Sequence, residues 1–140
     1  MSDDFPVTIY HNPACGTSRN TLAMIEAAGY RPIVVEYLKT GWTRRELQAL
    51  FAAMNAKPRD VLRRKGTPAE ELGLLNPDVS DDCILDAMVA HPVLVERPIV
   101  VTPKGTKLSR PSELVFDLLE RRPASFTKED GQVVIPTGRV

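Results

Sequence analysis

The chain has 140 residues, enough for one domain with a buried core. Its 18 basic and 18 acidic residues cancel, and a pI of about 6.7 argues against a general affinity for nucleic acid or anionic membranes. No apolar run approaches the roughly 20 residues of a membrane span, and Met1–Asp4 lacks the basic and apolar regions of a secretory signal peptide. We therefore expect a cytoplasmic protein.

The first predicted elements are a strand, a loop and a helix over residues 7–29. The run Val7-Thr8-Ile9-Tyr10 has the two-residue period of a strand. Asn12-Pro13 ends this strand, because proline offers no amide proton to a sheet. Apolar residues then recur at helical spacing up to Gly29, a natural helix stop. Cys15 is therefore expected at the N-terminal end of a helix.

This position of Cys15 favours a chemical role. The first turn of a helix has unpaired N–H groups and a partial positive charge, so a thiol there loses its proton more easily, and the thiolate is the reactive form. The same amides can hold an oxyanion, and Gly16 lets the backbone approach it closely. A protonated His11 would favour the thiolate, whereas a neutral His11 would only satisfy loop carbonyls. Arg19 is expected to pair with a nearby carboxylate.

The middle of the chain changes from strand to helix. Residues 33–38, Ile-Val-Val-Glu-Tyr-Leu, predict a buried strand, and the order strand, helix, strand implies a right-handed unit with parallel strands. Residues 42–91 then predict only helices. Their signals are a capping box at Thr43–Glu46, a turn or short helix from Pro58, a short helix opened by Thr67-Pro68, and a helix capped by Ser80.

Strands return after Pro92. Residues 98–102 and 106–109 flank Pro103-Lys104-Gly105, which is typical of a tight hairpin turn. Pro111 suits the first position of a last helix. We therefore predict one α/β domain, residues 1–140. Its parts are a core of about 5–41 and 92–123, a helical insertion of about 42–91, and a weakly patterned peripheral tail of about 124–140.

The cysteine loop carries a family resemblance. The run from His11 to Thr21, His-Asn-Pro-Ala-Cys-Gly-Thr-Ser-Arg-Asn-Thr, resembles the active-site signature of the glutaredoxin-coupled arsenate reductases, the ArsC family. The resemblance runs from about Val7 to Glu129 and takes in four further segments, residues 61–65, 91–103, 105–113 and 126–131. It implies a thioredoxin-like, glutaredoxin-type fold with a helical insertion between βαβ and ββα halves, and a cis-proline at Arg97-Pro98.

The resemblance also implies a reaction and a set of site residues. The family's cysteine and three substrate-binding arginines fall on Cys15, Arg63, Arg97 and Arg110, with His11 and Gly16 in support. The implied reaction reduces arsenate to arsenite through a covalent adduct on the cysteine, as arsenic detoxification. Glutathione is the implied co-substrate and glutaredoxin the implied partner, with no bound cofactor and no metal. A monomer is expected. Arg64 or Arg59 could serve in place of Arg63.

The second cysteine, Cys83, lies too far along the chain to form a C-x-x-C pair with Cys15. A reducing compartment disfavours a disulfide between them. Cys83 falls in a helical pattern and is expected in the core, and His91 is expected to pack or cap. If Cys15 does redox work, the resolving thiol therefore comes from another molecule.

The same residues bear on three other thiol functions. The phosphatase-like arsenate reductases need C-x5-R, and the position six after Cys15 is Thr21. A thioredoxin-fold regulator of the Spx type, which binds RNA polymerase, typically has C-x-x-C where this chain has Ser18. A general glutaredoxin-like thiol transferase needs only one cysteine of low pKa. The regulator and the thiol transferase remain the alternatives.

Overall fold

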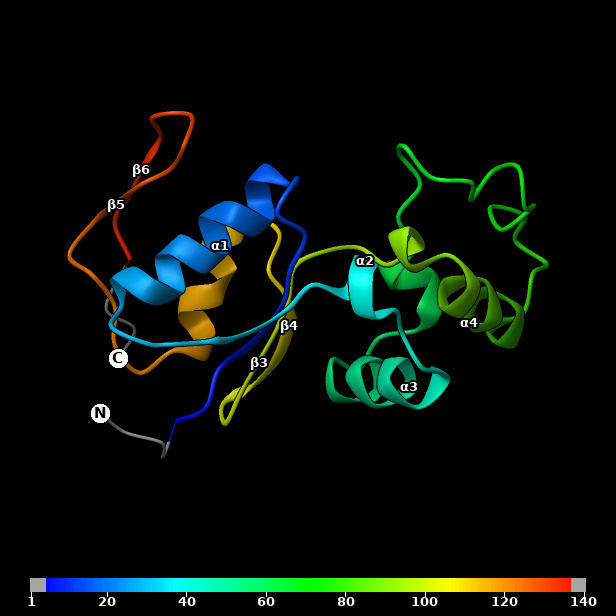
Figure 1. Ribbon diagram of the computed structural model, residues 1–140, viewed down its shortest axis with the longest axis horizontal. Helices are drawn as coiled ribbons and strands as arrows, with labels where there is room; N and C mark the ends of the chain where they lie inside the picture. The colour runs from blue at the N-terminus through cyan, green and yellow to red at the C-terminus, as the bar shows by residue number, and fades with distance from the viewer. Residues whose placement is uncertain (1–4, 137–140) are drawn as a thin grey trace. The chain divides into compact units, whose positions relative to one another are not determined.

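The computed structural model describes residues 5–136 and contains two compact units. The sheet unit consists of the described residues up to Glu36 and from Arg97 onward, and the helical unit is Tyr37–Glu96 (Figure 1). The prediction of a single domain over residues 1–140 stays a prediction. Within residues 5–136, no helix has the length and apolar character that crossing a membrane requires.

The sheet unit is built on a four-stranded sheet with the order β2-β1-β3-β4. The strands are β1 (Thr8–Tyr10), β2 (Ile33–Val35), β3 (Ile99–Thr102) and β4 (Gly105–Leu108). β1 runs parallel to β2 and antiparallel to β3, and β3 and β4 form an antiparallel hairpin. The predicted parallel pair and the predicted hairpin are both present.

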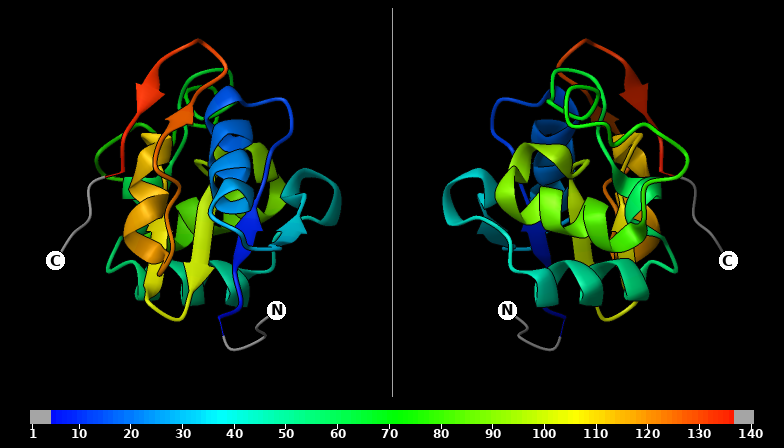
Figure 2. Two further views of the ribbon diagram at one scale, coloured as in Figure 1. Left: turned by 90° about the vertical axis from the view of Figure 1, so that its left-hand side faces the viewer. Right: turned by 90° about the vertical axis from the view of Figure 1, so that its right-hand side faces the viewer.

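The helix α1 (Gly16–Ala27) and the 3₁₀ helix η3 (Ser112–Leu118) lie side by side on one face of this sheet (Figure 2, left). Their apolar side chains meet those of β1 and β3 in one core. Its fully buried members include Ile9, Met24, Ile25, Val100 and Val115. Burial stabilises each such side chain by roughly 1.5–3 kcal/mol. This core anchors the two ends of the cysteine loop.

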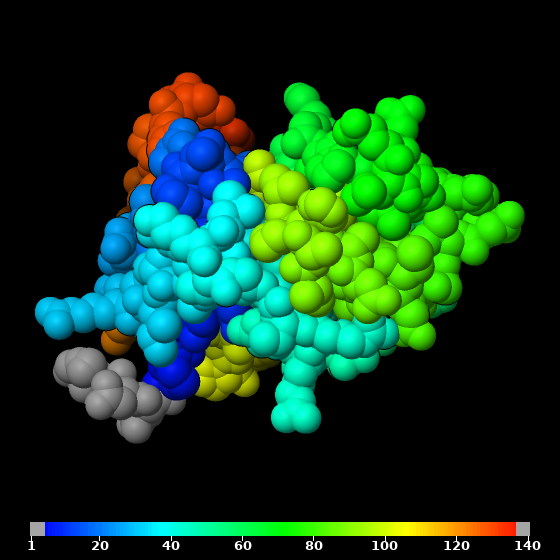
Figure 3. Space-filling view, turned by 45° about the vertical axis from the view of Figure 1, so that its right-hand side comes forward, coloured from blue at the N-terminus to red at the C-terminus, as the bar shows by residue number. Residues whose placement is uncertain are grey.

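Two predictions about these elements were wrong. β2 is short and exposed, because it lies at the sheet edge with a neighbour on one side only. Its segment lies on the surface shown in Figure 3, in light blue to cyan. Ile33 is 61% and Val34 41% exposed. The last helix is 3₁₀ rather than α, and it begins after Pro111. Three of its four buried residues, Ser112, Val115 and Leu118, recur every three positions, which is the period of a 3₁₀ helix, and Phe116 is the fourth.

The helical unit contains two 10-residue helices and several short ones. These are α2 (Tyr37–Thr40), α3 (Arg44–Ala53), η1 (Pro58–Val61), α4 (Asp81–Ala90) and η2 (Pro92–Leu94). The Thr43–Glu46 capping box is present, and Ser80 Oγ accepts the Cys83 N–H, so both predicted caps are confirmed. No β-strand lies in residues 42–91, all of which the structure describes.

Two further predictions in this unit were wrong. The segment after Thr67-Pro68 forms turns rather than a helix. It makes a single helical turn, closed by the Leu72 N–H and the Pro68 carbonyl, and Gly73 with a φ angle of 74° then ends it. Cys83 is exposed rather than buried. It stands on the outward side of α4, whose inward side is formed by Ile84, Leu85 and Met88.

The chain after residue 124 contains more structure than its weak pattern indicates. β5 (Phe126–Thr127) and β6 (Val133–Val134) form an antiparallel hairpin. Phe126 and Val134 pack against the core of the sheet unit. We call residues 126–134 the C-terminal hairpin, and Figure 1 shows it beside α1. The last four residues of the predicted tail lie outside the described residues.

Candidate active site

Strand register brings three loops to one end of the sheet. Tyr10 at the end of β1 lies opposite Ile99 at the start of β3, and Ile99 lies opposite Leu108 at the end of β4. The loop after β1, the segment before β3 and the segment after β4 must therefore meet. Cys15 and Arg110 become neighbours in this way although 95 positions separate them.

Two X-Pro peptide bonds lie at this end of the sheet, and both are cis. The predicted one, Arg97-Pro98, precedes β3, and a second one, Arg110-Pro111, follows β4. The Ser109 N–H donates to the Pro98 carbonyl at 2.9 Å, which ties the two segments together. The arginines of the two cis bonds therefore come from adjoining pieces of backbone.

Backbone hydrogen bonds shape the loop that carries the cysteine. The His11 N–H donates to the Val35 carbonyl at 2.8 Å, which fastens the loop to β2. Asn12 then closes two turns: its Oδ1 accepts the Ala14 N–H at 2.9 Å, and its carbonyl accepts the Cys15 N–H at 3.0 Å. Cys15 is the residue just before α1 and has an extended backbone. Its sulfur therefore lies beside the first amides of the helix, as predicted.

A buried serine lies beneath this loop. The Ser18 hydroxyl accepts the Asn12 N–H at 3.1 Å, and its oxygen is 2.6 Å from His11 Nδ1. A hydroxyl has two acceptor sites and one proton, so the direction of the His11–Ser18 hydrogen bond depends on the tautomer of His11. Burial lowers the pKa of His11, Glu36 opposes this and Arg19 adds to it. Burial thus favours the neutral form of His11.

The pKa of the Cys15 thiol is lowered. Burial acts to raise it, but a hydrogen bond and the positive charge from Arg97, the Ser18 N–H, and a hydrogen bond from Arg110 together outweigh burial. The Ser18 amide contributes although the sulfur makes no full capping hydrogen bond to the helix. Cys15 is largely buried, at 9% exposure. The result is a thiol prepared to act as a thiolate at lower pH than an ordinary cysteine.

Arg97 and Arg110 bring guanidinium donors to the Cys15 sulfur. Arg110 Nη1 lies 3.8 Å from the Cys15 sulfur and donates to the Arg97 carbonyl at 3.0 Å. Arg97 Nε is buried and makes no hydrogen bond among the described residues. An unsatisfied buried donor beside a thiolate is costly unless a ligand accepts from it. These donors suit a tetrahedral oxyanion next to the sulfur.

The third predicted arginine, Arg63, belongs to the helical unit, whereas the cysteine loop belongs to the sheet unit. Its Nη1 donates to Glu96 Oε1 at 2.9 Å, and both side chains are mostly buried. Arg59 donates to the carbonyls of Asn76 and Val79, so it is committed to holding a loop. Arg64 is exposed. The assignment of Arg63 to the site stays a prediction.

Comparison with known proteins places this geometry in a family. The family model described as "ArsC family" matches residues 10–118. The chain belongs to the ArsC family. It is 58% identical over 130 residues to the arsenate reductase ArsI2 of Synechocystis sp., covering 92% of this chain and 93% of that protein. It is 57% identical over 133 residues to an arsenate reductase of Rhizobium meliloti, covering 94% and 95%.

Solved structures agree with the family assignment. An arsenate reductase from Vibrio cholerae superimposes with a TM-score of 0.79 at 40% identity, covering 84% of this chain and all of that one. A protein described as a putative arsenate reductase from Yersinia pestis gives 0.75 at 40% identity, covering 79% and 98%. The predicted fold class, a thioredoxin-like α/β fold with a helical segment between βαβ and ββ parts, is confirmed.

One contact at the ArsC loop was predicted only in part. Arg19 does pair with a carboxylate, which confirms that expectation, but its partner Glu129 lies 110 positions away in the C-terminal hairpin. No spacing in the sequence links the two residues. The only available signal was that the family resemblance continues to Glu129.

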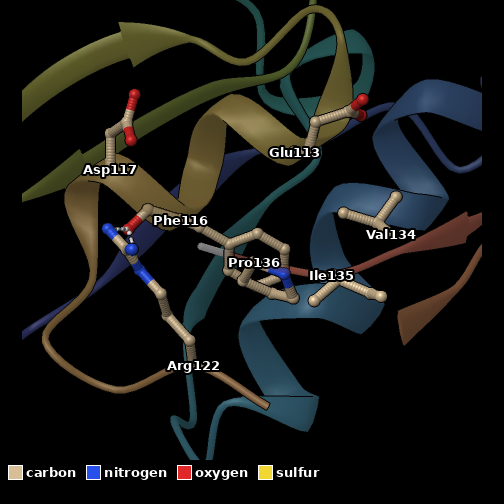
Figure 4. A pocket seen from close by; sticks show the side chains of 7 residues that line it. All are labelled: Glu113, Phe116, Asp117, Arg122, Val134, Ile135 and Pro136. Atoms are coloured by element: carbon tan, nitrogen blue, oxygen red, sulfur yellow. Dashed lines mark hydrogen bonds between the residues drawn. The ribbon is translucent and has the colours of Figure 1, made fainter. Parts of the chain in front are cut away.

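Two further features of the described residues bear on ligand binding. Within residues 5–136, no three His, Cys, Asp or Glu side chains are grouped so that they could hold a metal ion. A pocket of about 150 Å³ lies between η3 and the C-terminal hairpin, lined by residues that include Phe116, Arg122 and Pro136 (Figure 4). Arg122 is committed there to the Phe116 carbonyl. The pocket lining contains none of the residues around Cys15.

Proposed function

We propose that this ArsC-family protein reduces arsenate to arsenite, with the Cys15 thiolate as the nucleophile. The observation that carries the proposal is the lowered pKa of Cys15 between the hydrogen-bond donors of Arg97 and Arg110. The relatives described as arsenate reductases, at 57–58% identity, support the choice of substrate.

Arg97 and Arg110 hold the substrate before the reaction. Arsenate is a tetrahedral anion that a thiolate repels, so fixed cationic donors must neutralise it first. Charge-assisted hydrogen bonds are roughly twice as strong as neutral ones and give a defined orientation when the donor is a guanidinium. The free Arg97 Nε becomes satisfied when an oxyanion oxygen binds there. The amides at Gly16 add further donors at the start of α1.

The first chemical step is a displacement at arsenic. The Cys15 sulfur forms an S–As bond, and an arsenate oxygen leaves as water after accepting protons from the medium. Arsenic stays pentavalent in this adduct, so the step needs no reductant. The arginines stabilise the charge on the remaining arsenate oxygens.

The second step transfers electrons from thiols to arsenic. The thiol of glutathione attacks the Cys15 sulfur, the S–As bond breaks, and its electron pair stays on arsenic, which leaves as trivalent arsenite. Cys15 and glutathione are left as a mixed disulfide. A glutaredoxin thiol then attacks the glutathione sulfur and releases the Cys15 thiolate. We place this sequence in the cytoplasm, where reduced glutathione and glutaredoxin are maintained, and it requires no bound cofactor.

Three supporting roles belong to the same proposal. Arg63 adds a third cation to the substrate, or Arg64 does so from the same segment. His11 acts as a neutral ring that holds Ser18 in place. Gly16 leaves room for the oxyanion at the start of α1. The protein acts as a monomer, and the reaction serves arsenic resistance.

Ser18 argues against the regulator, and the two arginines argue against a general thiol transferase. It stands at the position where a C-x-x-C protein has its second thiol, and its hydroxyl is committed to His11 and Asn12. A disulfide switch of the Spx type therefore has no partner for Cys15 in this loop. A general thiol transferase does not need the two arginines beside the sulfur.

The test is arsenate-dependent oxidation of NADPH through glutathione reductase, glutathione and glutaredoxin, with purified protein. We expect turnover only when arsenate, glutathione, glutaredoxin and Cys15 are all present. The Cys15→Ser variant is the control for uncatalysed reduction. Reduction of a small disulfide substrate without any response to arsenate would instead identify a thiol transferase. Binding of RNA polymerase with no turnover of arsenate would identify a regulator.

A further inference from the structure

We propose that Glu129 is a positioning residue for the cysteine loop: it fixes the Arg19 guanidinium, which in turn holds the Pro13 carbonyl next to Cys15. The C-terminal hairpin then contributes to the active site although it touches neither sulfur nor substrate. This inference rests on the proposed function, because it concerns how that same site keeps its shape.

Arg19 is bound on both sides of its guanidinium. Its Nε and Nη2 donate to the two Glu129 oxygens at 2.8 and 2.9 Å, which is a bidentate pair. Its Nη1 donates to the Pro13 carbonyl at 2.9 Å. Once Glu129 holds Nε and Nη2, the plane of the guanidinium is set, and the N–H groups on Nη1 can point only in directions within that plane. The position of the Pro13 peptide is therefore coupled to that of Glu129.

Glu129 is itself held by the hairpin and by α1. Its N–H donates to Asn20 Oδ1 at 3.1 Å. The preceding Lys128 is largely buried, and its Nζ lies 2.7 Å from Glu113 Oε1 on η3. The Lys128 N–H also donates to the Gln132 carbonyl across the hairpin turn. Glu129 thus reaches Arg19 from an anchored backbone rather than from a free tail.

The loop needs this support because its outer side is open. Pro13 and Ala14 are exposed, whereas Cys15 next to them is buried. With Arg19 in place, two successive carbonyls are fixed, that of Asn12 by the Cys15 N–H and that of Pro13 by Arg19. The Asn12–Pro13 and Pro13–Ala14 peptide planes are therefore oriented before any substrate arrives, which is the kind of preorganisation that catalysis requires.

The pair also controls a charge near the nucleophile. The hydrogen bonds and negative charge of Glu129 raise the pKa of Arg19, and the negative charge of Cys15 adds to this effect. Arg19 is therefore within electrostatic reach of the thiolate, and Glu129 balances its charge. Removing one member leaves an uncompensated charge near the sulfur. Removing both residues leaves no uncompensated charge. The loop loses its support whether Glu129, Arg19 or both are removed.

Loss of Glu129 and loss of Arg19 should shift the pKa of Cys15 in opposite directions, and the experiment uses this difference. The variants are Glu129→Gln, Arg19→Gln and the double variant, and three quantities are measured for each. They are hydrogen–deuterium exchange of residues 11–18, the pKa of Cys15 from its alkylation by iodoacetamide across pH, and the arsenate kinetics. Arg19→Lys keeps the charge without the planar fork. Glu113→Gln is the matched control, because it breaks the other ion pair of the same hairpin.

We expect faster exchange of the loop amides and a loss of kcat/KM of about tenfold in all three variants and in Arg19→Lys, less than the ~100-fold that a 1 Å misplacement can cause. The pKa of Cys15 should fall in Glu129→Gln and rise in Arg19→Gln. It should return to the wild-type value in the double variant and stay there in Arg19→Lys. Glu113→Gln should change each of the three quantities much less than Glu129→Gln does, because the Asn20 contact and the hairpin turn still hold Glu129 in place.

Unchanged loop exchange in Glu129→Gln would overturn the proposal. So would an equal effect of Glu113→Gln, since the hairpin's stability and not Arg19 would then be responsible. A double variant that regains wild-type kcat/KM would reduce the pair to a charge effect and also overturn it. If the wild-type protein reduces no arsenate, the proposed function fails, whereas loop exchange and the Cys15 pKa still decide the role of Glu129.

Discussion

Cys15 and Cys83 both lie at the N-terminal end of a helix, and they differ in nearly everything else. Cys15 precedes α1 with an extended backbone, so its sulfur lies beside the free amides of the first turn. Cys83 is the third residue of α4, where its own N–H is taken up by Ser80 Oγ. Cys15 is buried and Cys83 is exposed.

Their charged surroundings differ as well. Arg97 and Arg110 donate to the Cys15 sulfur and lower its pKa against the effect of burial. The charged neighbours of Cys83 along α4 include Asp82 and Asp86, which pair with Arg44 at 2.6 and 2.5 Å. The comparison teaches that the end of a helix does not by itself make a reactive cysteine. Cations delivered from distant parts of the chain complete the site.

The strongest test of this comparison exchanges each sulfur for oxygen. Cys15→Ser should abolish arsenate reduction, because the hydroxyl is a far weaker nucleophile at neutral pH. Cys83→Ser should keep activity, since this side chain is exposed and its helix keeps the Ser80 cap. The measurement is coupled NADPH oxidation at saturating glutathione and glutaredoxin. Loss of activity in a folded Cys83→Ser variant would refute the single-thiol mechanism.

The next largest effect should come from the arginines that distinguish the two cysteines. Arg97→Ala and Arg110→Ala should each raise the pKa of Cys15 and weaken turnover, because each variant removes a donor that now lowers this pKa. At a pH below the ordinary pKa of a thiol, the wild-type Cys15 should still be alkylated quickly. The two alanine variants should lose this fast alkylation. Arg→Lys at either position should preserve much of the thiolate while still damaging turnover, because the planar fork is lost.

Alkylation by iodoacetamide across pH, read by mass spectrometry at each cysteine, measures both thiols in one sample. Cys83 serves as the internal control, and its profile should be the same in every arginine variant. Alanine variants at Arg97 and Arg110 with wild-type alkylation and kinetics would remove both residues from the site. That result would support a general thiol transferase instead of an arsenate reductase.

Arg63 should give a smaller and different effect. If it contacts only the substrate, Arg63→Ala should raise KM for arsenate several-fold and leave the alkylation profile of Cys15 unchanged. Because Arg63 pairs with Glu96, Glu96→Gln is the control for loss of that ion pair. Arg64→Ala tests the alternative from the same segment. An increase in KM only in Arg64→Ala would reassign the third cation.

The smallest effect should come from the cap of α4. Ser80→Ala removes the acceptor of the Cys83 N–H and should lower the free energy of unfolding by about 1 kcal/mol. Thr43→Ala, which removes the corresponding cap of α3, should cost a similar amount. Chemical denaturation measures both losses. Neither variant should change the alkylation profile of Cys15, and a change in that profile would mean that the two cysteine environments are not independent.

Local patterns in the sequence were sufficient for much of this protein. The strand, proline and helix signals of residues 7–29 placed Cys15 at the start of α1, because turn residues and caps act over a few positions. The caps at Thr43 and Ser80 were predictable for the same reason. Arg97-Pro98 and Arg110 came from family resemblance, since nothing in the spacing of these residues brings them to the sulfur.

Tertiary structure decided what depends on contacts between distant residues. β2 was expected to be buried and is exposed, because an apolar run does not reveal whether a strand lies at the edge or the centre of a sheet. Cys83 was expected in the core and is exposed. A helical pattern does not determine which side of the helix faces inward when the neighbours are unknown. Glu129 reaches Arg19 across 110 positions only because the C-terminal hairpin folds back onto α1. Local sequence thus determines that the site is built on a cysteine at the start of a helix. Strand register and packing determine which distant residues lower the pKa of that cysteine and support its loop.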